Sequence, residues 1–198
     1  MGGTADLAYT RLAQLGGLPS EWSYPYTSGT GVAGKCHGLP LAPEQPHTGA
    51  VLAAANVTGH VAVTSNDYDA VMAALANVGP LTITVDAGGW HDYEEGVFSG
   101  GNHSNPDLDH LVQLVGYGVD EAVRAVHGGD SGMYFLVRNS WTPSWGIDGY
   151  IKLARSPTPT CGTDINPADG DGCKGGPPTA KVCGQSGVLY DAVYPLVQ

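Results

Sequence analysis

Two polar side chains stand at the ends of apolar runs, where they could share a proton-transfer task. His110 precedes the apolar run Leu111–Tyr117 and follows the polar loop Gly100–Asp109. Asn139 comes directly after a second apolar run, Met133–Arg138. An imidazole held at a rigid strand end can give and take a proton, and an asparagine amide can accept from its N–H and fix its tautomer.

Two tryptophans, Trp141 and Trp145, follow Asn139 within the segment Arg138-Asn-Ser-Trp-Thr-Pro-Ser-Trp-Gly-Ile-Asp-Gly-Tyr150. An indole over a histidine–asparagine contact would exclude water and strengthen the hydrogen bond. Each segment also has a structural interpretation. His110 could cap a strand and bond a nearby carbonyl, and Asn139 could occupy a turn beside two core tryptophans. Taken separately, the two segments leave both interpretations open.

The cysteines give a weaker signal. Cys161, Cys173 and Cys183 lie in a segment rich in Gly, Pro and Asp, and Cys36 stands far upstream. They could be free thiols. A loop so poor in apolar residues needs a further restraint, however, which favours at least one disulfide. The spacing does not choose the pair. Neither a CxxC nor a His-x-His pattern occurs, so we expect no metal site and no cofactor.

Charge and hydropathy exclude several classes of protein. Nineteen acidic residues against eight basic ones give a net charge of -11, and no cluster of Lys and Arg occurs. Binding to a phosphate backbone or to an anionic membrane surface is therefore not expected. No apolar stretch approaches the roughly 20 residues needed to cross a bilayer. The 42% of hydrophobic residues is enough to build a core.

The elements that must position these side chains can be read from periodicity and capping. One helix follows Thr4-Ala5-Asp6 and ends at Gly16-Gly17, and a second follows the cap Ser65-Asn66-Asp67 and ends at Gly79-Pro80. The expected strands are two within 51–64, then 81–85, 111–117, 133–138, 150–154 and 188–194. The segments 18–50, 87–106 and 118–131 are expected to be irregular. Few helices and several non-adjacent strands indicate an α+β fold with an antiparallel sheet or an open barrel.

The order of His110, Asn139 and the Trp141-x-x-x-Trp145-Gly-x-x-Gly-Tyr segment resembles the papain-like cysteine peptidases, of the cathepsin L-like kind. Three further stretches resemble that family. They are Met1-Gly2-Gly3 before the first helix, Gly17–Tyr26, and Gly187–Pro195. The resemblance covers nearly the whole chain. It implies that residues 1–50 are a remnant of the helical domain and that residues 51–198 form the sheet domain.

The resemblance also implies roles at the site. His110 would be the general acid/base, Asn139 its orienting partner, and Trp141, supported by Trp145, the cover over their bond. The family's Gln-to-Cys-Gly-x-Cys-Trp segment lies upstream of the Gly-Gly pair matched here. We therefore expect the chain to lack the nucleophilic cysteine and the oxyanion-hole glutamine, and to be inactive alone. Cys36 matches a structural half-cystine of the family.

Substrate-binding positions carry over in part. By resemblance they are Gly2, Gly3, Thr4, Ala5, Leu108, Asp109, Leu111 and Asp191. The backbone of Gly3 would pair with the substrate as a short strand. Asp191 matches the floor of the second pocket, where a carboxylate would accept basic as well as bulky apolar side chains. Alternatively, Asp191 points to solvent.

Three functional interpretations follow. The first is a fragment or truncated gene model of a thiol endopeptidase that hydrolyses peptide bonds in a secreted or lysosomal/vacuolar setting. The second is a non-catalytic peptide-binding or regulatory chain of the same fold. The third is a split enzyme whose cysteine comes from a separate chain. The expected partners are a peptide or protein substrate and the missing N-terminal segment, in cis or in trans.

Overall fold

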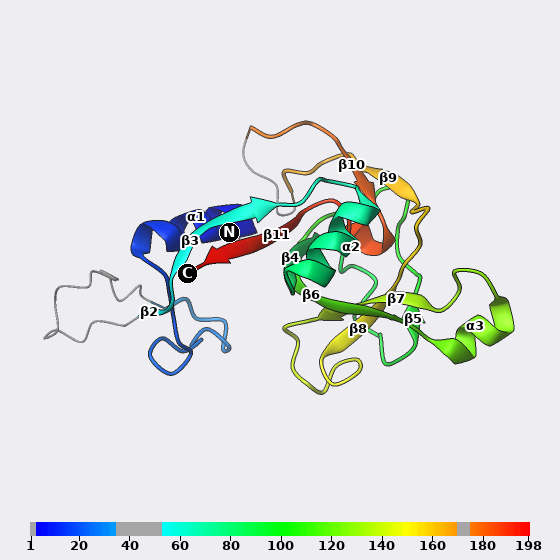
Figure 1. Cartoon of the computed structure of the whole chain (residues 1–198), viewed down its shortest axis with the longest axis horizontal. Helices are drawn as coiled ribbons and strands as arrows, with labels where there is room; N and C mark the ends of the chain where they lie inside the picture. The colour runs from blue at the N-terminus through cyan, green and yellow to red at the C-terminus, as the bar shows by residue number, and fades with distance from the viewer. Residues whose placement is uncertain (1–2, 35–52, 170–174) are drawn as a thin grey trace, which may run out of the picture. The chain divides into compact units, whose positions relative to one another are not determined.

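The computed structural model describes residues 3–34, 53–169 and 175–198 (Figure 1). By its internal contacts the chain divides into a large unit, Met1–Ala5 with Ala62–Tyr194, and a small unit, Asp6–Val61 with Pro195–Gln198. The expected domain boundary after residue 50 lies outside the described residues and stays a prediction. Within the described ranges, no helix is both long and apolar enough to span a membrane.

Helix α1 (Ala5–Leu15) has the bounds that its sequence pattern predicts, and all but its first residue belong to the small unit. It ends because Gly16 takes a φ of 85°, which an L side chain rarely adopts, and because the Gly17 N–H donates to Leu12 O. In the same unit His60 stacks on Tyr9, with 6.4 Å between ring centroids. These contacts give α1 a partner within the small unit.

The strands of the small unit are short. Strand β1 (Leu18–Pro19) pairs antiparallel with β2 (Ala53–Ala55). Strand β3 (Val57–Ala62) neighbours β11 (Ala192–Val197) in the sheet order. The Thr58 hydroxyl donates to Leu196 O and the Gln198 N–H donates to Asn56 O. The two strands expected within 51–64 are therefore present.

The large unit is built on an open sheet with the strand order β11-β4-β6-β7-β8-β5. The strands not yet introduced are β4 (Leu81–Val85), β5 (Val97–Phe98), β6 (His110–Val119), β7 (Met133–Arg138) and β8 (Tyr150–Ala154). Neighbours are antiparallel except β5 and β8, which are parallel. The α+β class is confirmed, although this parallel pair makes the sheet mixed.

One face of this sheet carries the core. Helix α2 (Tyr68–Asn77) begins at the cap Asp67, whose carboxylate accepts from the Ala70 N–H at 2.9 Å, and it buries Val71 and Leu75. Strand residues with at most 1% exposure complete this core: Leu81, Ile83, Leu114, Phe135, Val137, Ile151 and Leu153. Burial of each such side chain stabilises the fold by about 1.5–3 kcal/mol. The core therefore fixes β6 and β7, whose ends carry His110 and Asn139.

Five segments differ from the sequence-based expectation. Two are the short strands β1 and β5, which lie inside the expected irregular segments 18–50 and 87–106. Helix α3 (Glu121–His127) lies within the expected loop 118–131 and buries none of its residues. Strands β9 (Cys161–Asp164) and β10 (Ala180–Cys183) form an antiparallel hairpin in the segment rich in Gly and Pro. The expected strand 188–194 is regular only from Ala192 onward, because the 3-10 turn η1 (Gln185–Gly187) precedes it.

The hairpin also settles the cysteine pairing. Cys161 and Cys183 are directly opposite in the β9–β10 register and form a disulfide. The expected disulfide is therefore present. Cys36 and Cys173 lie outside the described residues.

Candidate active site

The site lies at the end of two inner strands of the large unit's sheet, where β6 begins and β7 ends. Gln113 pairs with Arg138 across these antiparallel strands, so the start of β6 and the residues after β7 lie at the same end of the sheet. The His110 Nε2 atom lies 2.8 Å from Asn139 Oδ1. Strand pairing thus brings together two residues that lie 29 positions apart.

The hydrogen bonds around Asn139 fix the direction of this contact. The Ser140 backbone N–H donates to Asn139 Oδ1 at 2.7 Å, so the atom at that position must be the amide oxygen. The His110 Nε2 atom must then carry the proton that it donates to Oδ1. In the neutral ring, Nδ1 keeps the lone pair and can accept a proton.

The amide nitrogen of Asn139 gives a second indication. Among the described residues it is one of two buried side-chain N or O atoms without a hydrogen-bond partner. An unmade hydrogen bond of this kind costs about 1–3 kcal/mol. The nitrogen is therefore left without a partner within the described part of the protein, while the oxygen of the same amide bonds His110.

Aromatic rings surround the His110–Asn139 contact. Trp141 stacks on His110 with 5.3 Å between centroids, and the fully buried Trp90 meets the same imidazole edge-on at 6.3 Å. Trp90 also stacks on Trp145, whose indole N–H donates to Trp90 O. Indole rings packed around a hydrogen bond reduce the access of water and lower the local dielectric constant. We expect this packing to strengthen the hydrogen bond between His110 and Asn139.

The turn that carries the tryptophans depends on glycine. Gly146 has a φ of 56°, and a Cβ at this position would lie 2.6 Å from Tyr150 O and 3.1 Å from the Tyr93 ring. Neither the backbone conformation nor the space accommodates another residue. The glycine that follows Trp145 is therefore needed to close the turn back onto β8.

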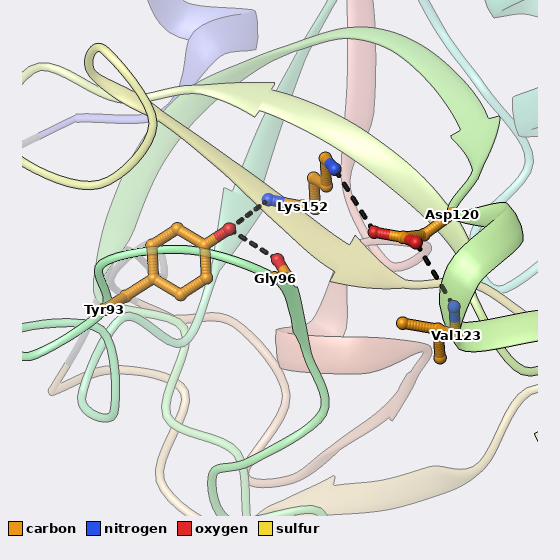
Figure 2. Close-up of polar contacts among 5 residues, drawn as sticks. All are labelled: Tyr93, Gly96, Asp120, Val123 and Lys152. Carbon is orange, nitrogen blue, oxygen red and sulfur yellow. Dashed lines mark hydrogen bonds and ion pairs between the residues drawn. The ribbon is translucent and has the colours of Figure 1, made fainter. Parts of the chain in front are cut away.

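Tyr93, in the loop before β5, hydrogen-bonds Gly96 and Lys152 (Figure 2). Its hydroxyl donates to Gly96 O at 2.6 Å and accepts from the Lys152 N–H of β8 at 3.3 Å, and its ring packs on Trp145. Burial raises the pKa of the Tyr93 phenol above its ordinary value, which keeps the donor protonated. Figure 2 also shows Lys152 reaching Asp120, the cap of α3, across 3.6 Å.

A cavity of about 230 Å³ lies in the large unit. Thr4, Leu108 and Asp191, three of the residues carried over from the family, are among its lining residues. The buried Thr84 hydroxyl donates to Asp191 Oδ2 at 2.7 Å. The carboxylate of Asp191 is therefore half-buried at the wall of a cavity.

The other carried-over positions lie elsewhere. Ala5 is buried at the start of α1 and Leu111 is half-buried on β6, and neither lines this cavity. Asp109 accepts from the Ala87 N–H at 3.1 Å and so supports the backbone before His110. Gly3 is exposed, and Gly2 lies outside the described residues.

Three residues at these sites were not identified from the sequence. Trp90 lies in a glycine-rich loop, and its only sequence signal was a large aromatic residue in a polar setting. His91 is exposed and stacks on Trp141 at 5.1 Å, with 4° between the ring planes. Asp164 lines the cavity from β9, a strand that no periodicity predicted. Among the described residues no group of three or more His, Cys, Asp or Glu could hold a metal ion.

The surroundings of the cavity are acidic. The pKa of Asp107 is raised from its ordinary value of 3.8, first by burial and then by repulsion from Asp169, Asp109, Asp164 and Asp86. Asp107 itself is largely exposed, so solvent screens much of this repulsion. Asp164, which lines the cavity, is one of the carboxylates whose repulsion raises the pKa of Asp107.

Comparison with known proteins places this geometry in context. The profile of the papain family cysteine proteases matches residues 1–170. Procathepsin L of Rattus norvegicus is 38% identical over 165 residues, which are 81% of this chain and 43% of that protein. Vignain of Phaseolus vulgaris is 37% identical over 159 residues, which are 78% of this chain and 37% of that protein.

Solved structures agree with these matches. The bromelain protease of Ananas comosus, determined in complex with the E64 inhibitor, has a TM-score of 0.69 and 27% identity, and the match covers 100% of this chain and 71% of that one. Digestive procathepsin L2 of Tenebrio molitor has a TM-score of 0.68 and 28% identity, over 98% of this chain and 47% of that one. The chain thus spans 37% to 43% of the length of the vignain and procathepsin L relatives.

Proposed function

Because the chain belongs to the papain family of cysteine proteases, we propose that His110 and Asn139 form the proton-transfer part of a site that hydrolyses peptide bonds. The observation that carries the proposal is the contact of 2.8 Å between His110 Nε2 and Asn139 Oδ1 beneath Trp141. This contact leaves Nδ1 as the ring atom that exchanges the proton.

In the proposed mechanism a cysteine thiolate attacks the peptide carbonyl beside a protonated His110. The imidazolium gives its Nδ1 proton to the leaving amine. The neutral ring then takes a proton from the water that attacks the thioester, and the carboxylic acid product leaves. Asn139 holds the ring orientation throughout by accepting from Nε2. General acid/base catalysis of this kind contributes about 10²–10⁴-fold in rate.

The thiolate needs a source. Cys161 and Cys183 are joined to each other and cannot act as the nucleophile, and Cys36 and Cys173 lie outside the described residues. By resemblance to the family, we assign the nucleophile to polypeptide beyond these 198 residues, joined in cis or present as a separate chain. The greater length of the relatives supports this assignment. The 198 residues alone would then be inactive.

The cavity at Asp191 is proposed as the pocket for the second residue on the acyl side of the scissile bond. Its apolar lining would accept a bulky apolar side chain, and the Asp191 carboxylate would accept a basic one. Replacement by Asp191→Ala should lower the rate with arginine at this position relative to leucine. An unchanged ratio of the two rates would reject the pocket assignment.

The decisive experiment joins a cysteine-bearing N-terminal segment of a relative to the chain, by fusion and by co-expression. We expect peptide hydrolysis that a thiol-alkylating reagent abolishes and that His110→Ala lowers by about 10²-fold or more. Asp69→Asn, an exposed change on α2, serves as the control and should leave the rate unchanged. Tight peptide binding without hydrolysis would instead support the non-catalytic, peptide-binding alternative.

The Cys161–Cys183 disulfide bears on the compartment. Disulfides persist in oxidising environments and are rare in the cytosol. We therefore propose a secreted or lysosomal/vacuolar location. Protein isolated from its natural source under thiol-blocking conditions should keep this bond oxidised, and quantitative alkylation of both cysteines would contradict the proposal.

A further inference from the structure

We propose that the β9–β10 hairpin adds a second carboxylate, Asp164, to the cavity at Asp191, so that the cavity selects a cationic side chain. The inference rests on the proposed function, because it assigns the preferred substrate side chain of that site. It makes Asp164 a specificity-determining residue in a hairpin that no sequence pattern predicted.

Residues of the hairpin, and described residues of the segment that joins its strands, line the cavity. They are Asp164, Pro167, Ala168, Gly176, Pro177 and Ala180. The other lining residues are Thr4, Thr84, Leu108, Tyr190 and Asp191. The Cys161–Cys183 disulfide joins the two strands at the other end of the hairpin register. Strand pairing and this covalent link therefore hold Asp164 and Ala180, which face each other in the register.

Asp164 lines the cavity as a buried acid. It ends β9 with 3% exposure, and its Oδ1 atom accepts from the Asn166 N–H at 2.9 Å. Among the described residues, the ion pairs are His60 with Asp6 and Lys152 with Asp120, and Asp164 takes part in neither. An ionised carboxylate that is removed from water is costly unless a cation pairs with it. A cationic ligand in the cavity would supply that pairing.

The walls fit a long basic side chain in size as well as in charge. A volume of about 230 Å³ equals the share of roughly eight water molecules in the liquid, which suits a single extended side chain. Leu108, Pro177 and Ala180 offer apolar surface to a methylene stem. The carboxylates of Asp164 and Asp191 offer acceptors to its charged end.

The test uses Asp164→Asn, because the amide keeps an oxygen that can accept from Asn166 while the charge is lost. In the enzyme assembled with a cysteine-bearing segment, we expect the ratio of kcat/KM for arginine over leucine substrates to fall about tenfold, as loss of one charge-assisted contact predicts. The kcat/KM for leucine substrates should stay unchanged, and the Tm should not fall, because the amide removes an unpaired buried charge. The control Asp69→Asn should leave the arginine-to-leucine ratio unchanged. A ratio unaffected by Asp164→Asn, in an active enzyme whose Tm has not fallen, would overturn the inference.

A binding measurement separates this inference from the proposed function. Titration of the 198-residue chain with N-acetyl-arginine amide and N-acetyl-leucine amide can be followed through the backbone NMR signals of Thr84 and Ala180. We expect tighter binding of the arginine amide, and a loss of that preference in Asp164→Asn. If the assembled enzyme is inactive and this preference is present, the proposed function fails and the cation site stands. Equal binding of both amides by the unaltered chain overturns the site.

Discussion

At the scale of single residues, the site is built around the contact between His110 and Asn139. Asn139 makes two hydrogen bonds through its oxygen and none through its buried nitrogen among the described residues. Trp141 covers the imidazole that this oxygen orients. Both residues were singled out from the sequence, and their roles came from the resemblance to the papain-like family, since their positions after a strand left a structural interpretation open. Trp90 was not singled out, because a tryptophan inside a glycine-rich loop carries no periodicity.

Replacement of Trp141 tests the role of the indole cover. Trp141→Ala should lower kcat/KM of the assembled enzyme about tenfold, because water then competes for the hydrogen bond between His110 and Asn139. Trp141→Phe retains a ring and should recover most of the activity. Peptide hydrolysis assays on both variants give the comparison, and equal loss in the two would argue against a shielding role.

Asp107 predicts a pH dependence of stability. Its folded-state pKa lies above the ordinary 3.8, so the folded protein binds the proton more tightly than the unfolded chain does. The contribution of protonated Asp107 to the free energy of unfolding is therefore fully present below about pH 3.8, and it is lost as the pH rises through the folded-state pKa. Asp107→Asn should stabilise the protein at neutral pH by less than about 1 kcal/mol, given the exposure of the residue. Urea unfolding should show this gain disappearing in acid, and a gain of equal size at low pH would contradict it.

At the scale of elements, helices and strands were predicted correctly where one buried face gives the apolar residues a regular spacing in the sequence. Strands β7 and β8 were predicted with the bounds that the structure has, since alternation and flanking turns define both. Helix α3 was not predicted because it buries no residue and so leaves no apolar stripe. The hairpin β9–β10 was not predicted because its segment is rich in glycine and proline and shows no alternating apolar pattern. Which cysteines form the disulfide followed only from the structure, because their spacing in the sequence allows several pairs.

The disulfide should account for a measurable part of the stability of the hairpin. It closes a loop of 22 residues, for which chain entropy predicts about 3 kcal/mol. The double replacement Cys161→Ser with Cys183→Ser should lower the free energy of unfolding by about this amount. Denaturant titration of both proteins measures the difference. A change within a few tenths of a kcal/mol would show that strand pairing alone holds the hairpin.

At the scale of the whole molecule, the two units differ in how much core they possess. The buried core is concentrated in the large unit, whereas Val57 is the one buried hydrophobic side chain that the described part of the small unit contributes. Trp22 and Tyr26 of the small unit are 98% and 76% exposed. The described part of the small unit therefore buries little apolar surface.

Amide hydrogen exchange should report this difference. Opening free energy follows the number of buried apolar contacts, so amides of β4, β6 and β7 should exchange slowly and those of α1 rapidly. Addition of a cysteine-bearing N-terminal segment should slow exchange in α1 more than in the sheet. Protection of α1 equal to that of β6 in the isolated chain would contradict the unequal distribution of the core.

The central claim is that Asn139 holds His110 with its proton on Nε2 and leaves Nδ1 as the reactive atom. Nitrogen NMR of the His110 ring in the 198-residue chain measures the tautomer directly. We expect the Nε2–H form in the neutral ring, and a shift toward a mixture of tautomers in Asn139→Ala. A ring protonated on Nδ1, or a tautomer that Asn139→Ala leaves unchanged, would contradict the account.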